Sequence, residues 1–138
     1  MIRLTHIGGP TTLIEIGGRR LLTDPTFDPP GRRYAFGWGG ASRKLAGPAT
    51  APEQLLPLDA VLLTHDHHAD NLDDTGREFL PSAGAVVTTS SGAARIAQRM
   101  PLKNLHGLRA GGASCCRALG QACRRSKSRP PPAATDHR

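Results

Sequence analysis

The apolar run "AVLLT" at residues 60–64 is the feature that most constrains the fold of this chain. Nearly continuous apolar residues over a short segment predict a strand buried on both faces, which is typical of a sheet that lies between other layers. The segment "GAVVTT" at residues 84–89 predicts a second strand of the same kind. Because helical patterns follow both runs, the sequence predicts a layered α/β fold.

The two helices expected after these strands have recognisable ends. The first is predicted over about residues 72–80, with Asp70 or Asn71 as its N-cap and Pro81 ending it. The second is an amphipathic helix over residues 90–100, for which Ser90 or Ser91 is the expected N-cap. The segment "LKNLHGL" that follows Pro101 is expected to begin one more strand.

The first 57 residues predict three strands and a long connection. Strands are expected near residues 2–7, 11–16 and 19–23, and the glycine pair between the last two predicts a hairpin. Residues 24–57 are rich in proline and glycine and predict a long irregular loop, a feature that is usually functional or disordered in compact domains. Its aromatic residues either wall a substrate pocket or anchor the loop, and they are Tyr34, Phe36 and Trp38.

Charge and composition divide the chain near Leu108. The formal net charge is +7, but residues 1–108 hold 11 basic and 10 acidic residues, so the excess lies in residues 109–138. In that segment Leu119 is the only large aliphatic residue, so it is not expected to fold independently. Two explanations fit this composition: a disordered basic tail, or a shifted reading frame, which the abrupt loss of strand patterning favours.

Several classes of protein are disfavoured by the sequence. No stretch approaches the roughly 18 consecutive apolar residues of a membrane span, and the N-terminus lacks the pattern of a signal peptide, so a cytoplasmic protein without a membrane partner is expected. Cys115, Cys116 and Cys123 lack the C-x-x-C spacing of a metal site and are interpreted as free thiols. The basic tail would contact phosphates only nonspecifically, so no specific nucleic-acid partner is expected.

A dense group of metal-competent residues follows the first buried strand. The segment "LLTHDHHADNLD" places three histidines within four positions, followed by aspartates. Imidazole and carboxylate together suit Zn, Fe or Mn better than Ca or Mg, and ligands commonly sit at strand ends in α/β sheets. A bound metal with an open position lowers the pKa of its water to about 7, and a nearby carboxylate orients that water or accepts its proton. The alternative is that the aspartates serve only the helix N-terminus.

Two segments of the chain resemble a known family. "AVLLTHDHHADNLD" resembles the metal-binding signature of the metallo-β-lactamase superfamily, a strand followed by T-H-x-H-x-D-H, and "LTHIGGPTTLIEIGGRRLLTDPTFD" resembles the opening hairpins of its lactonase-like branch. The resemblance covers residues 1–108. It implies a four-layer αββα sandwich, one or two divalent metals with Zn first and Mn or Fe as alternatives, and hydrolysis of a small-molecule ester, lactone, amide or phosphodiester.

The resemblance also implies roles for individual residues. In the register anchored by "LLTH", His65 and His67 are the first ligands, and Asp70 follows after one extra residue as ligand and catalytic, water-orienting base. A register shifted by one uses Asp66 and His68 instead, so His68 is included among the expected ligands. Asn71 stands where the family has a histidine and is a poor Zn ligand, which weakens a second metal site. Three further residues are expected to hydrogen-bond to the ligands and orient them without binding the metal: Asp24, Asp66 and Asn71.

The family completes its site with ligands from a second half that has no counterpart here. The later histidines, His106 and His137, stand in no ligand motif. Residues 1–108 are therefore expected to form the first αβ half of an incomplete sandwich, with one sheet face uncovered, weak or absent activity, and poor solubility or dependence on a partner. The alternatives are a non-catalytic metal-binding remnant and, less favoured, a nucleic-acid binder acting through the basic tail.

Overall fold

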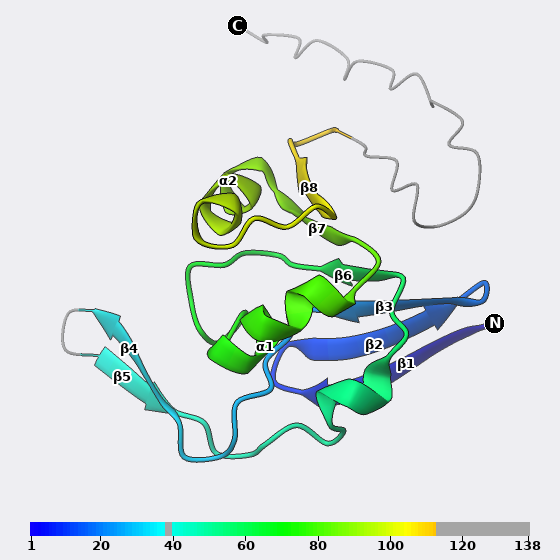
Figure 1. Cartoon of the computed structure of the whole chain (residues 1–138). Helices are drawn as coiled ribbons and strands as arrows, with labels where there is room; N and C mark the ends of the chain where they lie inside the picture. The colour runs from blue at the N-terminus through cyan, green and yellow to red at the C-terminus, as the bar shows by residue number, and fades with distance from the viewer. Residues whose placement is uncertain (38–39, 113–138) are drawn as a thin grey trace, which may run out of the picture.

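A six-stranded sheet and two crossover helices make up most of the fold (Figure 1). This computed structural model describes residues 1–37 and 40–112. The strands lie side by side in the order β1-β2-β3-β6-β7-β8. Their bounds are Ile2–Gly8 for β1, Thr11–Ile16 for β2, Arg19–Thr23 for β3, Ala60–Leu62 for β6, Val86–Thr89 for β7 and Leu105–Leu108 for β8.

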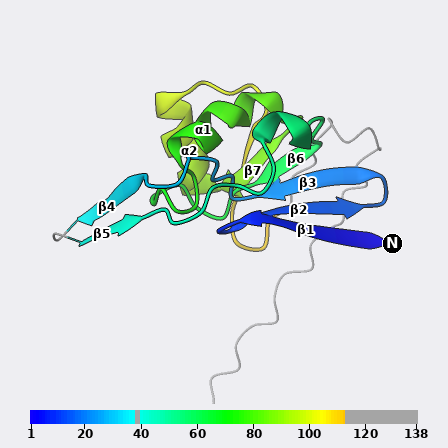
Figure 2. The ribbon, with the colours of Figure 1, turned by 90° about the horizontal axis from the view of Figure 1, so that it is seen from below.

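The sheet is mixed. Strands β1, β2 and β3 are antiparallel neighbours, whereas β3, β6, β7 and β8 pair in parallel. Helix α1 (Asp74–Phe79) connects β6 to β7, and α2 (Ser90–Arg99) connects β7 to β8. Figure 2 shows both helices on the same side of the sheet, as expected when successive parallel strands are joined by crossovers of the same hand. The predicted α/β fold is confirmed, as two layers within the described residues.

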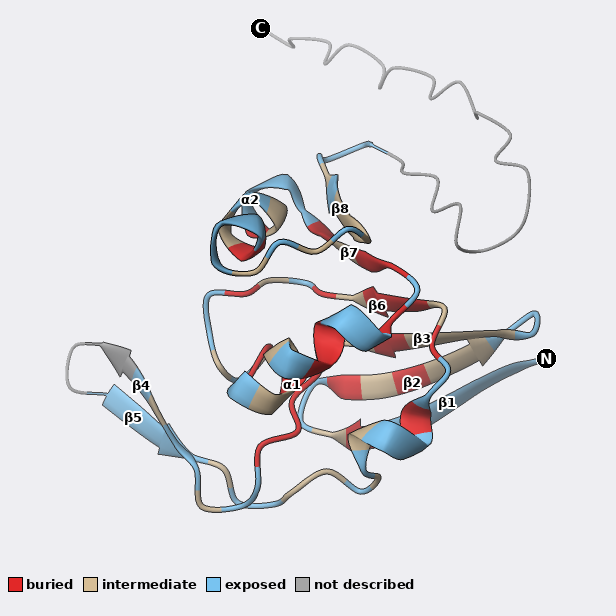
Figure 3. Cartoon of the chain, viewed as in Figure 1, coloured by how far each residue is buried: buried red, intermediate tan, exposed pale blue. Residues whose placement is uncertain are grey.

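The core lies between the sheet and these helices. Leu22, Val61 and Val86 on neighbouring strands are 0% exposed and face α1 and α2. From the other side, Leu80 and Ile96 are also 0% exposed and fill the space between helices and sheet. Figure 3 shows this buried band running through the middle of the sheet and along the inner side of α1. The continuous apolar runs of the sequence therefore mark the central strands, as predicted.

Both predicted helix caps were wrong by a few residues. The N-cap of α1 is Asp73, whose side chain accepts a 2.7 Å hydrogen bond from the Gly76 N–H. The predicted caps precede it in a turn, where the Asn71 N–H donates to the His68 carbonyl, so neither Asp70 nor Asn71 can cap the helix. Thr89, rather than Ser90 or Ser91, caps α2 by accepting from the Gly92 N–H.

The connection over residues 24–57 is more regular than predicted. It contains a hairpin of β4 (Arg33–Gly37) and β5 (Gly40–Arg43), and a 3-10 turn, η1 (Pro52–Leu55). A second such turn, η2 (Leu80–Ser82), follows α1. The Tyr34 hydroxyl donates to the Asp28 carboxylate at 3.2 Å, so this aromatic residue anchors the connection. Trp38, like the segment from residue 113 onward, lies outside the described residues, and within the described part no helix is long and apolar enough to cross a membrane.

Gly76 allows α1 to approach the chain that leaves β3. A Cβ atom at this position would lie 1.9 Å from the Pro25 carbonyl oxygen, a distance that requires the helix or the backbone after β3 to move. The helix therefore packs directly on the turn that begins with Asp24. A glycine at this position is a requirement of the fold, because any side chain would separate the two segments.

We predict that Gly76→Ala destabilises the protein by about 2–3 kcal/mol, because the added methyl group overpacks a buried backbone contact. Urea denaturation of the full chain measures this change. Glu78→Ala, an exposed position on the same helix, is the matched control and should change the free energy of unfolding by less than about 0.5 kcal/mol. Equal stability of Gly76→Ala and the original protein would contradict the observed packing.

Candidate metal centre

The histidine cluster lies in the loop that joins β6 to α1. The Leu63 N–H donates to the Val87 carbonyl at 2.8 Å, so the sheet ladder continues up to the residue before the loop. Leu72, 2% exposed, anchors the other end of the loop in the core. Because β3 and β6 are parallel, Asp24 after β3 and Thr64 after β6 lie at the same edge of the sheet. The loop is therefore fixed at both ends and opens at the carboxyl edge of the parallel strands, where ligands commonly bind.

Asp24 ties the two strand ends together. Its side chain is buried, and its Oδ1 accepts hydrogen bonds from the Thr64 N–H at 2.7 Å and from the Thr64 hydroxyl at 3.0 Å. Its own N–H donates to the Leu62 carbonyl. Asp24 also has a φ of +31°, a conformation that side-chain-bearing residues rarely adopt and that clusters at functional sites. The surrounding hydrogen bonds hold it in this conformation.

These bonds determine the tautomer of His65. The Thr64 hydroxyl has one proton, which it donates to the Asp24 carboxylate. The 3.0 Å contact between this hydroxyl and the His65 Nδ1 therefore requires Nδ1 to carry a proton and donate it. In the neutral imidazole this leaves a lone pair on Nε2, the form in which histidine binds a metal. The Asn71 amide donates to the same hydroxyl at 3.3 Å and completes its hydrogen bonding.

The three imidazoles gather around the loop without forming a complete metal site. The ring centroid of His65 lies 6.3 Å from that of His67 and 5.8 Å from that of His68, and the last two are 6.4 Å apart. His67, His68 and Asp70 are exposed. Across residues 1–37 and 40–112, however, no group of three or more His, Cys, Asp or Glu side chains is placed to hold a metal ion. The donor chemistry suits Zn, but the described residues do not enclose one.

Asp66 is held by an ion pair with the second helix. Its side chain is 3% exposed and forms a two-pronged ion pair with Arg95 of α2, through Nε at 3.1 Å and through a second guanidinium nitrogen at 2.5 Å. Burial raises the pKa of Asp66, but the bonds from Arg95 outweigh this effect and hold it below its usual value. Asp66 thus joins the histidine loop to α2.

A second network of buried carboxylates holds the long connection beside the loop. The Asp73 side chain is fully buried and accepts from the Asp28 N–H at 2.6 Å and from the Lys44 ammonium at 3.1 Å. Asp28 accepts from the N–H and hydroxyl of Thr75, and Arg32 pairs with Asp74. Burial raises the pKa of Asp28, but these hydrogen bonds lower it further than burial raises it. The base of the β4–β5 hairpin is therefore fixed to the start of α1.

Some of these residues were among those expected from the sequence to support the ligands, and others were not. Asp24 and Asn71 were expected to support the ligands, and both lie against Thr64 beside His65. Thr64 was treated only as part of the "LLTH" anchor, although its position directly before the first histidine was the available signal. Arg95 was missed because nothing in its own segment shows that it meets a carboxylate 29 positions earlier.

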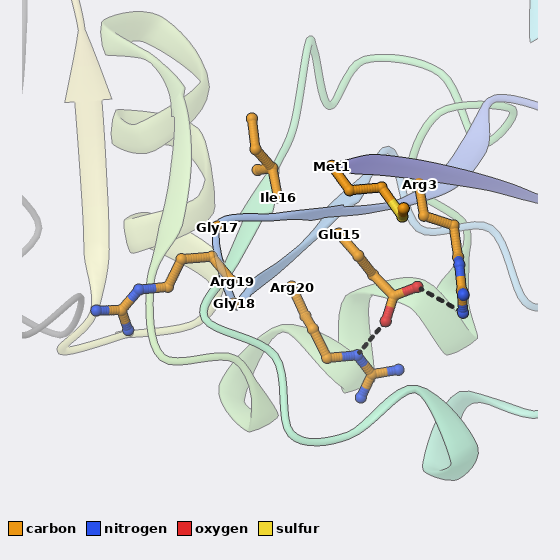
Figure 4. Close-up of a pocket in the computed structure, with 8 residues that line it drawn as sticks. All are labelled: Met1, Arg3, Glu15, Ile16, Gly17, Gly18, Arg19 and Arg20. Atoms are coloured by element: carbon orange, nitrogen blue, oxygen red, sulfur yellow. Dashed lines mark ion pairs between the residues drawn. The ribbon is translucent and has the colours of Figure 1, made fainter.

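A separate surface depression lies at the opposite end of the sheet (Figure 4). It has a volume of about 320 Å³ and is formed by β1, β2, the turn between β2 and β3, and the start of β3. Glu15 points into it and pairs with Arg3 and Arg20, as the dashed lines in Figure 4 show. The turn precedes β3, whereas the histidine loop follows the parallel strand β6, so the depression is not part of the candidate metal centre.

Comparisons with known proteins relate this chain to hydrolases. No protein-family model matches it. A UPF0173 metal-dependent hydrolase from Aeropyrum pernix is 30% identical over 87 residues, which are 63% of this chain and 29% of that protein. The crystal structure of an isothiocyanate hydrolase from Delia radicum gut bacteria matches 79% of this chain and 42% of its own, with a TM-score of 0.64 and 28% identity.

The chain is similar to metal-dependent hydrolases. This confirms the predicted resemblance, and a possible metal-dependent hydrolase from Veillonella parvula has the same fold, with a TM-score of 0.64 at 21% identity. That match covers 78% of this chain and 42% of the solved one. The chain thus spans less than half the length of the metal-dependent hydrolases it matches, and the likeness to them is partial.

We predict that Arg95→Ala lowers the free energy of unfolding by about 2 kcal/mol at pH 7, since it leaves a buried carboxylate without its cation. The pKa of Asp66 is lower in the folded protein than its unfolded value of about 3.9, so the pair contributes its full stability above about pH 4. That contribution is lost as the pH falls through the folded-state pKa.

Urea denaturation at a series of pH values measures this difference, which should narrow on acidification. Arg99→Ala, an exposed substitution near the end of the same helix, is the control. A loss of stability in Arg95→Ala that does not change between pH 7 and pH values below about 4 would show that the ion pair is not its cause.

Proposed function

We propose that this chain forms part of the metal site of a metal-dependent hydrolase, with Zn as the favoured ion and Mn or Fe as alternatives. The hydrogen-bonded series from Asp24 through Thr64 to His65 is the observation that carries the proposal. It presents the Nε2 lone pair of one histidine at the edge of the sheet. A fixed tautomer and ring orientation are typical of histidines that bind metals.

The other donors follow from the position of the loop. His67 is the second proposed ligand, His68 an additional one, and Asp70 both a ligand and the group that orients the attacking water or accepts its proton. A bound divalent ion would supply a hydroxide nucleophile near neutral pH. The loop residues exposed around it are imidazoles and a carboxylate, and the chain's own role is to hold these donors by the ties at Asp24 and Asp66.

The proposed substrates are small molecules with an electrophilic carbon or phosphorus centre, such as an ester, lactone, amide or phosphodiester. One solved relative is an isothiocyanate hydrolase, so an isothiocyanate is added to this set as a probe. Selectivity among these substrates depends on the side chains that line a substrate pocket. The described residues near the loop contribute few apolar side chains to such a lining.

We further propose that residues 1–108 correspond to the first half of the hydrolase domain and that this chain alone is weakly active or inactive. The incomplete donor set of the described residues supports this proposal, as does the match to less than half of each solved relative. The full four-layer sandwich would then require a second sheet against the one seen here.

The alternative function is metal binding without catalysis. Two observations favour it. The ring of His65 is held in one orientation by Thr64, and the part of the chain that the structure describes has no complete set of metal ligands. Both functions predict that this chain binds a divalent ion, but only the first predicts hydrolysis once the second half of the domain completes the site.

We predict that the full chain binds Zn and that His65→Ala and His67→Ala each lower its affinity at least tenfold. Thr64→Val should lower affinity about 10- to 100-fold, because it removes the hydroxyl that orients His65, whereas Thr64→Ser should retain most of it. Competition with a coloured Zn chelator measures these affinities. His106→Ala, a substitution of a histidine on β8, is the control for nonspecific binding.

Unchanged Zn affinity in His65→Ala would contradict the proposed site. Turnover of the substrate panel by the Zn-loaded full chain, abolished in His65→Ala, would instead contradict the proposal that the chain is inactive alone and would favour the hydrolase over the non-catalytic alternative. Zn binding without turnover by this chain is the expected result.

A further inference from the structure

One face of the six-stranded sheet carries many large apolar side chains and has no helix over it in the described part of the chain. Side chains alternate between the two faces along each strand, and α1 and α2 both lie on one side (Figure 2). The residues on the other side do not belong to the hydrophobic core. The large apolar residues of this open face are Ile2, Leu4, Ile14, Ile16, Leu21, Leu62, Val87 and Leu108, and the same register also places His6, Thr12, Arg19, Thr23 and His106 on it.

The apolar residues follow one another across the strands, with Ala60 on β6 opposite Leu21 on β3. Leu4 lies opposite Ile14, and Ile14 lies opposite Leu21, so the apolar side chains cross from β1 to β3 in register. Leu62 and Val87 pair in the same way between β6 and β7. At the β1 edge, Ile2 is 61% exposed and Leu4 67% exposed. An apolar surface of this extent is typical of an interaction site rather than of a free surface.

The rest of this chain does not provide the apolar side chains needed to cover the open face. Among residues 113–138, Leu119 is the only member of the set Val, Ile, Leu, Met, Phe, Trp and Tyr. The hairpin of β4 and β5 projects away from the sheet in both ribbon views (Figures 1 and 2). The apolar side chains of a covering surface therefore come from outside residues 1–138.

The length of the solved relatives indicates how large the covering segment is. The matched region is 42% of each solved chain, so two such regions together would account for most of one relative. A second copy of this chain has both the required length and the required chemistry, because its own open face is equally apolar. The centre of the face, at Ile14, Leu21 and Leu62, carries no charge that an identical partner would have to neutralise.

We propose that a second copy of this chain covers the open face and forms a symmetric dimer. Two apolar sheets pack face to face about 10 Å apart with their strands roughly aligned, and a two-fold axis is the commonest symmetry of such pairs. The dimer has four layers in the order helices, sheet, sheet, helices. This inference does not depend on metal binding and can fail or succeed independently of the proposed function.

The test is the molar mass and dissociation constant of the metal-free full chain, measured by sedimentation equilibrium. The expected mass is twice that of the 14.6 kDa chain. Leu4→Glu places a charge on the open face at a position exposed in the single chain, so the monomer tolerates it while the dimer is weakened roughly 100-fold. Leu45→Glu, at a position 89% exposed away from the sheet, is the matched control and should leave the dimer unchanged.

Circular dichroism checks that each variant is folded. If Leu4→Glu loses its β-sheet signal, Ile2→Glu, whose side chain is 61% exposed on the same face, takes its place. A monomeric mass for the original chain at every concentration overturns the proposal. So does a dimer that withstands the open-face substitution, or a mass that increases with concentration beyond that of two chains.

Discussion

The bond between the Asp24 carboxylate and Thr64 is the interaction on which the candidate site depends. It joins the end of β3 to the end of β6 across 40 positions of sequence and determines where the histidine loop begins. The same hydroxyl that donates to Asp24 accepts from His65, so a structural tie between strands also selects the tautomer of a candidate ligand. The Thr64 side chain therefore both joins the two strands and orients the His65 ring.

Buried carboxylates fix the other segments around this site. Asp73 brings together the start of α1, the backbone at Asp28 and the Lys44 side chain, while Asp66 joins the loop to α2. Each carboxylate is satisfied by backbone N–H groups or a cation, which offsets the cost of burying it. The protein thus holds a histidine-bearing loop rigidly at its base while His67, His68 and Asp70 remain exposed at its tip.

The sequence predicted the strands and turns that depend on a local pattern of residues. The apolar runs located β6 and β7, the glycine pair located the β2–β3 hairpin, and the cluster of histidines located the loop. The α1 cap was misplaced because Asp70, Asn71 and Asp73 all suit that position locally, and only the turn at His68 decides among them. The ion pair of Arg95 could not be predicted, because only the folded chain brings Asp66 close to it. For Thr64 the sequence held one signal, its position directly before His65, but its bond to Asp24 depends on the fold.

The most direct test of the central claim is the protonation of the His65 ring in the full chain. Long-range proton–nitrogen correlation NMR distinguishes a nitrogen that carries a proton from one that has a lone pair or a bound metal. We predict that His65 is protonated at Nδ1 before Zn is added, and that Zn shifts the resonance of its Nε2. A proton on Nε2 in the Zn-free protein, or a His65 spectrum unchanged by Zn, would contradict it.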